Sequence, residues 1–402
     1  MKRYGVVAAL FVLSMITYID RACISTAKIP IARDLGFSDA QMGVVFSAFA
    51  LGYALAQIPS GWLADRYGPR LALAAVVSAW SLLTALTGAA WSFTSMVVIR
   101  FLFGVGEAGA FPGSARAFVN WLPVSERGVA NGVLFSGSRI GAALAFPLLV
   151  AMVERWGWRW SFVILGAVGV VWAAFWLSWF RDHPPKPVPV EPAAQVVRIS
   201  LGDVFRTRAF LPAMAQYFAG NFTFFICLSW MHPYLLRQYA LTSAEAAAHA
   251  TAPLLVGAVS QWTAGFLVDR LYNSRWRAWS RRLPAMTGFA LAAAGVLAVS
   301  AMETPLGAVI AFTAATFGAD MTISPSWSYC ADVAGRSAGS VSAAMNMIGN
   351  LGAFASANAF PWLLGLTGSA RAYFLAAAVL NLAAIGCWLA MRSVHAPATL
   401  DS

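Results

Sequence analysis

The sequence predicts an all-α membrane protein with twelve transmembrane helices in two pseudo-symmetric six-helix bundles. Three observations lead to this fold class. The 402 residues are 60% hydrophobic and 11% charged, with a mean hydropathy of +0.69, whereas ~25% of residues are charged in soluble proteins. Apolar segments of about 20 residues, the length that spans a bilayer, recur along the chain. Two motifs of the first half also return in the second half.

The apolar segments place the predicted spans in two groups of six. The first group falls at about 4–27, 41–63, 71–91, 95–117, 128–152 and 157–180. The second falls at about 209–236, 244–269, 283–302, 305–328, 337–363 and 369–391. The proline-rich, charged stretch between the groups is typical of a linker, with a short amphipathic helix expected near 201–205. The predicted domains are an N-terminal bundle (1–180), a cytoplasmic linker (181–208), and a C-terminal bundle with a short tail (209–402).

The basic residues are distributed unequally between the two sides of the predicted bundles. With the N-terminus in the cytoplasm, 18 Lys and Arg lie on the cytoplasmic side and 6 on the other, while Arg21, Arg100 and Arg139 lie within spans. Cytoplasmic loops of membrane proteins collect Lys and Arg. Both termini are therefore predicted to be cytoplasmic. The net charge of +11 follows from this topology, and we expect no nucleic-acid partner.

Two motifs repeat between the halves. Gly61-Trp62-Leu63-Ala64-Asp65-Arg66 follows the second span, and Gly265-Phe266-Leu267-Val268-Asp269-Arg270 follows the eighth, 204 positions later. Ala145-Phe146-Pro147-Leu148-Leu149 likewise returns as Ala359-Phe360-Pro361-Trp362-Leu363, 214 positions later. Internal repeats of this kind are typical of transporters that hold their substrate near the bilayer midplane, between two bundles.

The first span carries an acid and a base at membrane depth, Asp20 and Arg21. Such residues usually face a protein interior or a water-filled cavity. Tyr18 lies three residues before Arg21 and shares its helix face, whereas Asp20 points about 100° away. The guanidinium of arginine stays charged and suits a carboxylate, so Arg21 is predicted to bind an anionic substrate. The alternative is an internal salt bridge that holds helices together.

The predicted fourth span also carries an acidic residue at membrane depth, Glu107. A buried carboxyl group resists ionisation unless a cation lies beside it, so Glu107 is predicted to take up a proton when its arginine partner turns to substrate. Arg100 lies two helical turns earlier on the same face, and Arg21, Arg100 and Glu107 form a plausible switchable network. The alternative is a permanent ion pair. Asp20 is interpreted as a second proton-coupling group or as a helix lock.

Four stretches resemble known transporters. Gly61-Trp62-Leu63-Ala64-Asp65-Arg66-Tyr67-Gly68-Pro69-Arg70 resembles the signature loop of the major facilitator superfamily. The stretches Tyr18–Arg21, Arg100–Ala108 and Asn346–Gly352 resemble the anion:cation symporter family of sugar-acid, hexuronate and aromatic-carboxylate permeases, which is related to vesicular glutamate and sialic acid carriers. The resemblance covers nearly the whole chain. It implies that Arg21 binds a substrate carboxylate, that Asn350 contacts substrate, and that Glu107 and Asp20 take part in proton coupling.

The remaining candidates are polar, aromatic or basic residues on the spans. Arg139 stands where sugar-acid members often carry a neutral residue, and it suits a second carboxylate or an aromatic acid. Alternatively, it pairs with Glu107 or Asp20, or its side chain extends toward the membrane interface. Further substrate-binding candidates are Tyr53, Gln57, Asn221, Trp230, Tyr234, Ser326, Trp327 and Asn346. A gating role at the span ends is predicted for Asp65, Arg66, Arg70, Asp269 and Arg270. No role is assigned to His232 or Asp320.

These observations predict a proton-coupled symporter that imports an organic anion by alternating access. The anion is a sugar acid such as galactonate, a hexuronate or glucarate, or an aromatic carboxylate. A negative interior opposes anion entry by about 2.3 kcal/mol per charge per 100 mV, which cotransported protons offset. An exporter or exchanger of organic anions or drugs is the alternative. The sequence shows no phosphate-binding loop, no signalling domain of a sensor, and no catalytic or metal-ligand cluster of an enzyme. We expect no cofactor besides protons, and a monomer in the bacterial inner membrane.

Overall fold

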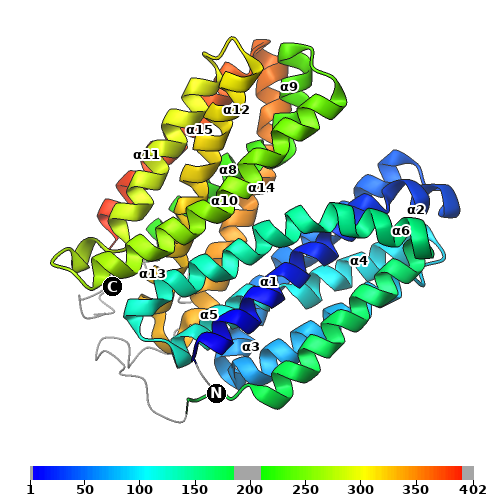
Figure 1. Ribbon diagram of the computed structural model, residues 1–402, viewed down its shortest axis with the longest axis horizontal. Coiled ribbons are helices and arrows are strands. Elements are labelled where there is room, and N and C mark those ends of the chain that lie inside the picture. Colours follow the sequence, from blue (N-terminus) through cyan, green and yellow to red (C-terminus); the bar gives the residue numbers. More distant parts are fainter. Residues whose placement is uncertain (1–2, 185–209, 392–402) are drawn as a thin grey trace. The chain divides into compact units, whose positions relative to one another are not determined.

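Every regular element of the computed structural model is a helix within the residues that it describes, 3–184 and 210–391 (Figure 1). The chain divides into two compact units, and each is described by itself. The described part of unit 1 covers 3–122, 137–184 and 335–343, and that of unit 2 covers 123–136, 210–334 and 344–391. The amphipathic helix predicted near 201–205 lies outside the described residues.

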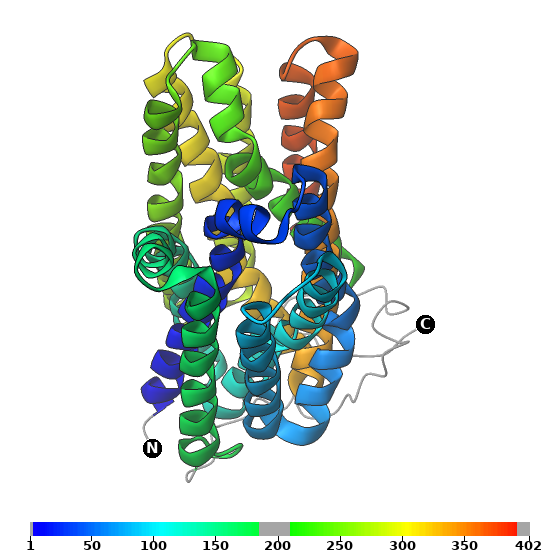
Figure 2. The ribbon, with the colours of Figure 1, turned by 90° about the vertical axis from the view of Figure 1, so that its right-hand side faces the viewer.

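Unit 1 begins with five helices. They are α1 (Arg3–Thr26), α2 (Lys28–Leu35), α3 (Asp39–Thr87), α4 (Phe93–Glu107) and α5 (Ala110–Trp121). The short helix α2 was not predicted and lies at an angle to α1 (Figure 2). Ser38 starts α3 through a capping box with Gln41, which satisfies backbone N–H groups that have no partner inside the helix. The long helix α3 packs against both α4 and α5.

Two positive-φ glycines interrupt the two longest helices. Gly68, at φ +81°, breaks α3, and Gly157, at φ +77°, breaks α6 (Arg127–Trp179), which follows the 3₁₀ turn η1 (Val124–Glu126). Glycine adopts this backbone conformation without the steric cost that other residues meet. The two breaks fall between the predicted second and third spans and between the fifth and sixth.

One apolar core joins α1, α2, α3 and α6 within unit 1. Ile24, Ile31, Met42 and Phe162 are each at most 3% exposed in this cluster. Burial of such side chains stabilises each by roughly 1.5–3 kcal/mol. The core packs the C-terminal part of α1 against the neighbouring helices. Asp20 and Arg21 lie on the same part of α1.

Unit 2 contains η1 and the start of α6 (127–136) together with the remaining helices, except that η4 and the start of α14 (338–343) belong to unit 1. They are α8 (Leu211–Ser229), α9 (Met231–Tyr239), α10 (Ser243–Tyr272), η3 (Arg277–Trp279), α11 (Arg282–Val299), α12 (Pro305–Met321), α13 (Ile323–Ala334), η4 (Gly335–Ser337, in unit 1), α14 (Ala338–Thr367) and α15 (Arg371–Ala390). Helix α11 packs on α12 and α15. An aromatic core that includes Phe222, Phe312, Tyr373 and Phe374 fills this unit.

Seven stretches of the described residues are long and apolar enough to cross a membrane. They are Arg3–Thr26, Ala40–Thr87, Phe93–Trp121, Pro147–Trp179, Arg282–Val299, Pro305–Thr367 and Arg371–Ala390. Large apolar side chains such as Val171 (69% exposed) and Val379 (63%) point outward from them, as expected for surfaces that face lipid. The total of twelve spans and the side on which the termini lie remain predictions.

Candidate functional site

The charged centre of unit 1 is the contact between Arg21 on α1 and Glu107 at the end of α4. Arg21 Nε donates to Glu107 Oε1 at 2.6 Å. The Glu107 side chain is fully buried, whereas the Arg21 side chain remains 22% exposed. A buried carboxylate needs a cation beside it to remain ionised. The predicted contact between these two residues is therefore present, with the arginine on its accessible side.

Aromatic rings surround the guanidinium of Arg21. Its central carbon lies 4.6 Å from the ring centre of Tyr53, 5.1 Å from that of Tyr18 and 5.3 Å from that of Phe49. Such cation–π contacts contribute ~0.5–2 kcal/mol each and hold the side chain in place. The structure brings the predicted residues Tyr18 and Tyr53 to Arg21; Phe49 was not predicted, although it lies one helical turn before Tyr53 on the same face of α3.

Both members of the pair have unused hydrogen-bonding capacity. Arg21 Nη2 and Glu107 Oε2 are buried and have no hydrogen-bond partner in the described residues. The guanidinium presents parallel donors that suit an anion, and the second carboxyl oxygen can carry a proton. An anion that draws Arg21 away would leave Glu107 without its cation, and protonation would then remove the buried charge.

Gly104 allows α4 to reach this position. A Cβ atom at Gly104 would lie 2.2 Å from the carbonyl oxygen of Phe49 and 2.8 Å from the backbone nitrogen of Tyr53. The backbones of α3 and α4 therefore meet directly beside the charged pair. Glycines at such crossings are typical of packed membrane helices, and this one places Phe49 and Tyr53 within reach of Arg21.

Asp20 and Arg100 form a second buried charged group in unit 1. Each is 1% exposed. Neither Asp20 oxygen has a hydrogen-bond partner among the residues described, and the same holds for Nε and Nη1 of Arg100. The Arg100 guanidinium lies over the rings of Phe103 (4.2 Å) and Phe49 (5.4 Å). Arg100 thus lies near the predicted network, but the direct hydrogen bond to Glu107 comes from Arg21.

Most second-half candidates lie in unit 2 and bond within their own bundle. Trp327 Nε1 donates to the Tyr217 hydroxyl at 2.9 Å, and Ser326 Oγ contacts Gln216 Oε1 at 3.1 Å. Trp327 and Ser326 are at most 1% exposed, and their contact with a substrate remains a prediction. The sequence analysis did not predict Tyr217 or Gln216 as partners of these residues. In the sequence they stand out only as two adjacent polar residues in an apolar segment.

The amide candidates of unit 2 are only partly buried. Asn350 Nδ2 donates to the Asn346 carbonyl at 2.8 Å, and Asn221 Nδ2 donates to the Tyr217 carbonyl at 2.9 Å. Trp230 Nε1 donates to the Ala357 carbonyl at 3.2 Å. The side chain of His232 lies outside those described. Asp320 is fully buried and accepts from Gln261 Nε2 at 3.4 Å.

The remaining first-half candidates are buried in unit 1. Gln57 is 0% and Arg139 is 5% exposed. Arg139 lies between Gly137 and Gly141, which pack against Phe11 and Met15 of α1. Both candidates interact with other residues, and their contact with a substrate remains a prediction.

The two repeated aspartates each bind the N-terminus of a helix. Asp65 accepts from the backbone N–H groups of Gly339 (2.9 Å) and Ser340 (2.7 Å) at the start of α14. Asp269 accepts from those of Gly128 (2.9 Å) and Val129 (2.7 Å) at the start of α6. A carboxylate at this point satisfies free N–H groups and the positive end of the helix dipole. These are the helix-end contacts predicted for gating residues.

The arginines of the two repeats lie elsewhere. Arg66 stacks on Trp62 and Tyr67, and Arg70 donates to the Leu177 carbonyl at 2.7 Å. Arg270 is exposed. Arg116, which was not a site candidate, approaches Asp65 at 3.6 Å. Helix-end contacts are thus present at the two aspartates and at Arg70, and a gating role for the five residues remains a prediction.

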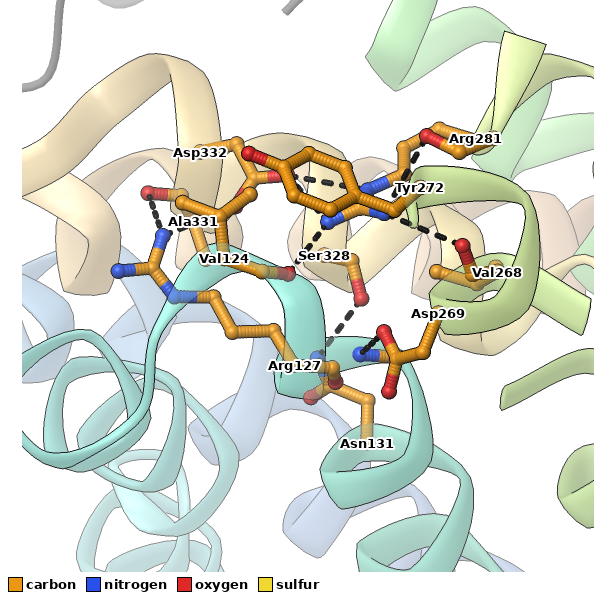
Figure 3. Close-up of polar contacts among 12 residues, drawn as sticks. Val124, Arg127, Asn131, Val268, Asp269, Tyr272, Arg281, Ser328, Ala331 and Asp332 are labelled. Carbon is orange, nitrogen blue, oxygen red and sulfur yellow. Dashed lines mark hydrogen bonds and ion pairs between the residues drawn. The ribbon is translucent and has the colours of Figure 1, made fainter. Parts of the chain in front are cut away.

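A buried ion triad near Asp269 was missed by the sequence reasoning. Asp332 on α13 accepts from Arg127 Nη1 at 2.8 Å and contacts Arg281 Nη2 at 2.9 Å, and Arg281 also donates to the Val124 carbonyl at 2.8 Å (Figure 3). Asp332 is the one charged residue of α13. That isolated charge was the only signal in the sequence, because its partners lie far away along the chain.

Comparison with known proteins is consistent with this architecture. The chain matches the Major Facilitator Superfamily over residues 10–357. It is 34% identical over 385 residues to a probable sulfoacetate transporter of Cupriavidus necator, covering 91% of this chain and 88% of that protein. It is 28% identical over 381 residues to a hexuronate transporter of Bacillus subtilis, covering 92% and 90%.

A solved structure shows the same fold. The transporter FucP in its outward conformation aligns with a TM-score of 0.75 at 14% identity, over 96% of this chain and 98% of that one. Together with the apolar spans, these findings show a multi-pass membrane protein of a transporter family and not an enzyme. The chain belongs to the Major Facilitator Superfamily.

Proposed function

We propose that this protein is a secondary active symporter that imports an organic anion together with protons. The observation that carries the proposal is the Arg21–Glu107 contact, in which an arginine that is 22% exposed neutralises a fully buried acid. The relatives described above carry sulfoacetate and hexuronate by name, and both substrates are organic anions. An anion-binding arginine shared with a buried acid couples anion binding to proton uptake.

The coupling has a direct electrostatic cause. When a carboxylate or sulfonate binds the guanidinium, the attraction between Arg21 and Glu107 weakens. The buried carboxylate then carries an uncompensated charge, which costs several kcal/mol and favours its protonation. Release of the anion on the other side returns Arg21 to Glu107 and expels the proton.

The positive charges of the first half indicate the class of substrate. Arg21 and Arg100 lie in candidate spans, and Arg139 lies in the predicted fifth span. Charges at membrane depth are costly and usually face a protein interior or a water-filled cavity. We propose a small anion with two acidic groups, or one acidic group on a polar or aromatic body. Sulfoacetate, glucuronate, galactonate and hydroxyphenylacetate form a suitable test panel.

The decisive experiment is uptake of a labelled anion into proteoliposomes with an inward proton gradient. The wild-type protein should accumulate its substrate, and dissipating the pH gradient should abolish accumulation. Glu107→Gln should lose accumulation but retain anion exchange, since the neutral amide no longer needs a proton. Arg21→Ala should lose binding of the anion as well as its transport.

Several outcomes would contradict the proposal. Accumulation by Glu107→Gln at the wild-type level would mean that Glu107 does not carry the proton. Retained affinity in Arg21→Ala would place the anion site elsewhere. Uptake driven only by an opposing anion would instead support an exchanger, and gradient-driven movement out of the vesicle would support an exporter.

A further inference from the structure

The loop that joins α10 to α11 has an unusual composition. Residues 270–282, here called the α10–α11 basic loop, contain Arg270, Arg275, Arg277, Arg281 and Arg282 together with Trp276 and Trp279, and no acidic residue. The loop lies wholly within unit 2. Five guanidinium groups on thirteen residues repel one another unless anions lie close by.

Part of the loop is tied to the protein. Arg281 is 2% exposed and bonds Asp332, as described above. Arg277 bonds the Tyr272 hydroxyl, and Arg282 donates to the Met391 carbonyl. These contacts fix the loop as a defined surface. Neither the Tyr272 hydroxyl nor the Met391 carbonyl carries an opposite charge.

The other two arginines point outward without a carboxylate. Arg270 and Arg275 are exposed, and neither forms an ion pair with an acid in the part of the chain that the structure describes. Arg275 stacks on Trp276, 5.7 Å from the ring centre. A guanidinium held over an indole keeps its donors free for an incoming phosphate, because stacking uses the flat face of the group and leaves the N–H edge open.

The tryptophans place this surface at the edge of a bilayer. Trp276 is 49% and Trp279 is 37% exposed, and both lie shortly before α11, which is apolar and long enough to span a membrane. Tryptophan beside basic residues at the ends of spans is characteristic of the headgroup level of a membrane. Exposed indoles of this kind suit the region where acyl chains meet headgroups, and the adjacent guanidinium groups suit the depth of lipid phosphates.

The corresponding loop of the first half carries fewer basic residues, although Arg66 there also stacks on Trp62 and Tyr67. From the last residue of the repeated motif to the next predicted span, its basic residues are Arg66 and Arg70. Arg70 is bound to the Leu177 carbonyl, and its backbone N–H donates to Asp182 at 2.8 Å. The general preference of loops for basic residues applies to both loops and does not explain five arginines in one of them.

We propose that the α10–α11 basic loop binds the phosphate headgroup of an anionic phospholipid. Arg270 and Arg275 contact the phosphodiester, and Trp276 and Trp279 lie against the upper part of the acyl chains. Phosphatidylglycerol has the required chemistry, because its phosphate is accessible and its headgroup carries no cation. The bound lipid secures Trp279, two residues before Arg281, and thus supports the Asp332 triad.

The test is the thermal unfolding of the full chain in lipid nanodiscs. Phosphatidylcholine discs are compared with discs that contain an equal share of phosphatidylglycerol, and retained lipid is counted by native mass spectrometry. Phosphatidylglycerol should raise the wild-type midpoint by several degrees. Arg270→Gln/Arg275→Gln should lose more than half of this shift and should retain fewer phosphatidylglycerol molecules.

A matched control variant removes two positive charges from exposed arginines outside the α10–α11 basic loop. Arg33 and Arg155 are exposed arginines of unit 1, and Arg155 also stacks on a neighbouring tryptophan, at 5.8 Å from the ring centre of Trp156. Arg33→Gln/Arg155→Gln should keep the full phosphatidylglycerol shift. Arg270→Lys/Arg275→Lys should keep most of the phosphatidylglycerol shift, because both positive charges remain. If the glutamine variant unfolds early in both lipids, loss of the shift in the lysine variant would contradict the proposed phosphate contact.

Three results would overturn the proposal. Arg270→Gln/Arg275→Gln could keep the whole rise in midpoint that phosphatidylglycerol causes. Alternatively, the control Arg33→Gln/Arg155→Gln could lose as much of that rise as Arg270→Gln/Arg275→Gln loses. Soluble glycerol phosphate could also stabilise the chain in phosphatidylcholine discs as strongly as phosphatidylglycerol does, which would identify a site for small phosphates rather than for lipid. None of these measurements depends on transport, so they stand apart from the test of the proposed function.

Discussion

At the scale of single residues, the geometry around Arg21 depends on a backbone contact more than on the charged groups themselves. Glu107 can reach Arg21 because α4 lies directly against α3 at Gly104. The same crossing positions Phe49 and Tyr53 against the guanidinium. A small change at Gly104 should therefore displace the acid and two of the aromatic partners together.

Gly104→Ala tests this dependence. Its Cβ would lie 2.2 Å from the Phe49 carbonyl oxygen, so the helices must separate, at a cost of about 1–3 kcal/mol. We expect a lower thermal midpoint and weaker anion binding, measured by thermal shift and equilibrium binding on the purified protein. Gly43→Ala is the control, because nothing lies within 4 Å of its added Cβ and alanine favours a helix by about 1 kcal/mol. Equal effects of the two substitutions would contradict the argument.

At the scale of helices, the Asp332 triad joins four elements of unit 2. It connects η1 and the start of α6 to α13 and to the start of α11 through Arg127, Arg281 and the Val124 carbonyl. All three charged side chains are at most 6% exposed. Asp332→Asn would leave two buried guanidinium groups without their anion, so the triad should be sensitive to the loss of one member.

We expect Asp332→Asn to destabilise the protein by about 3–5 kcal/mol, the usual cost of removing one partner from a buried ion pair. Thermal unfolding in detergent measures this loss. Asp34→Asn provides the comparison: Asp34 pairs with Arg159 at 3.1 Å, but their side chains are 48% and 43% exposed, and such pairs contribute only ~0.2–1 kcal/mol. A stability for Asp332→Asn no lower than that of Asp34→Asn would show that the triad does not stabilise these elements.

The same elements show what a sequence can and cannot reveal. The repeat that contains Asp65 and Asp269 predicted helix-end contacts, because the pattern marks both positions. Helix spacing and the family resemblance indicated Arg21 and Glu107. Asp332 carried no pattern, since Arg127 lies 205 residues away and only folding brings the two together. The short helix α2 was missed because Lys28, Arg33 and Asp34 interrupt the apolar periodicity that identified the other helices.

At the scale of the whole molecule, the number of buried acids would limit how many protons cross with the substrate under the proposed proton-coupled function. Unit 1 holds two fully or almost fully buried acids near its charged centre, Glu107 at 0% and Asp20 at 1% exposed. A substrate with two negative charges, such as sulfoacetate, is opposed by about 4.6 kcal/mol at 100 mV of inside-negative potential, which is roughly two thousandfold in concentration ratio. Two protons carried with it remove this opposition entirely.

If each acid carries one proton with a dianion, transport is electroneutral, and accumulation should respond to the pH gradient but not to voltage. Asp20→Asn removes one of the two carriers, so each cycle would then move one net negative charge inward. An inside-negative potential should therefore slow the variant and leave the wild-type protein unaffected. Uptake of labelled dianion into proteoliposomes clamped with potassium and valinomycin measures both responses. Equal voltage dependence in the two proteins would show that Asp20 carries no transported proton and acts as a helix lock, because the charge balance would then be unchanged by its loss.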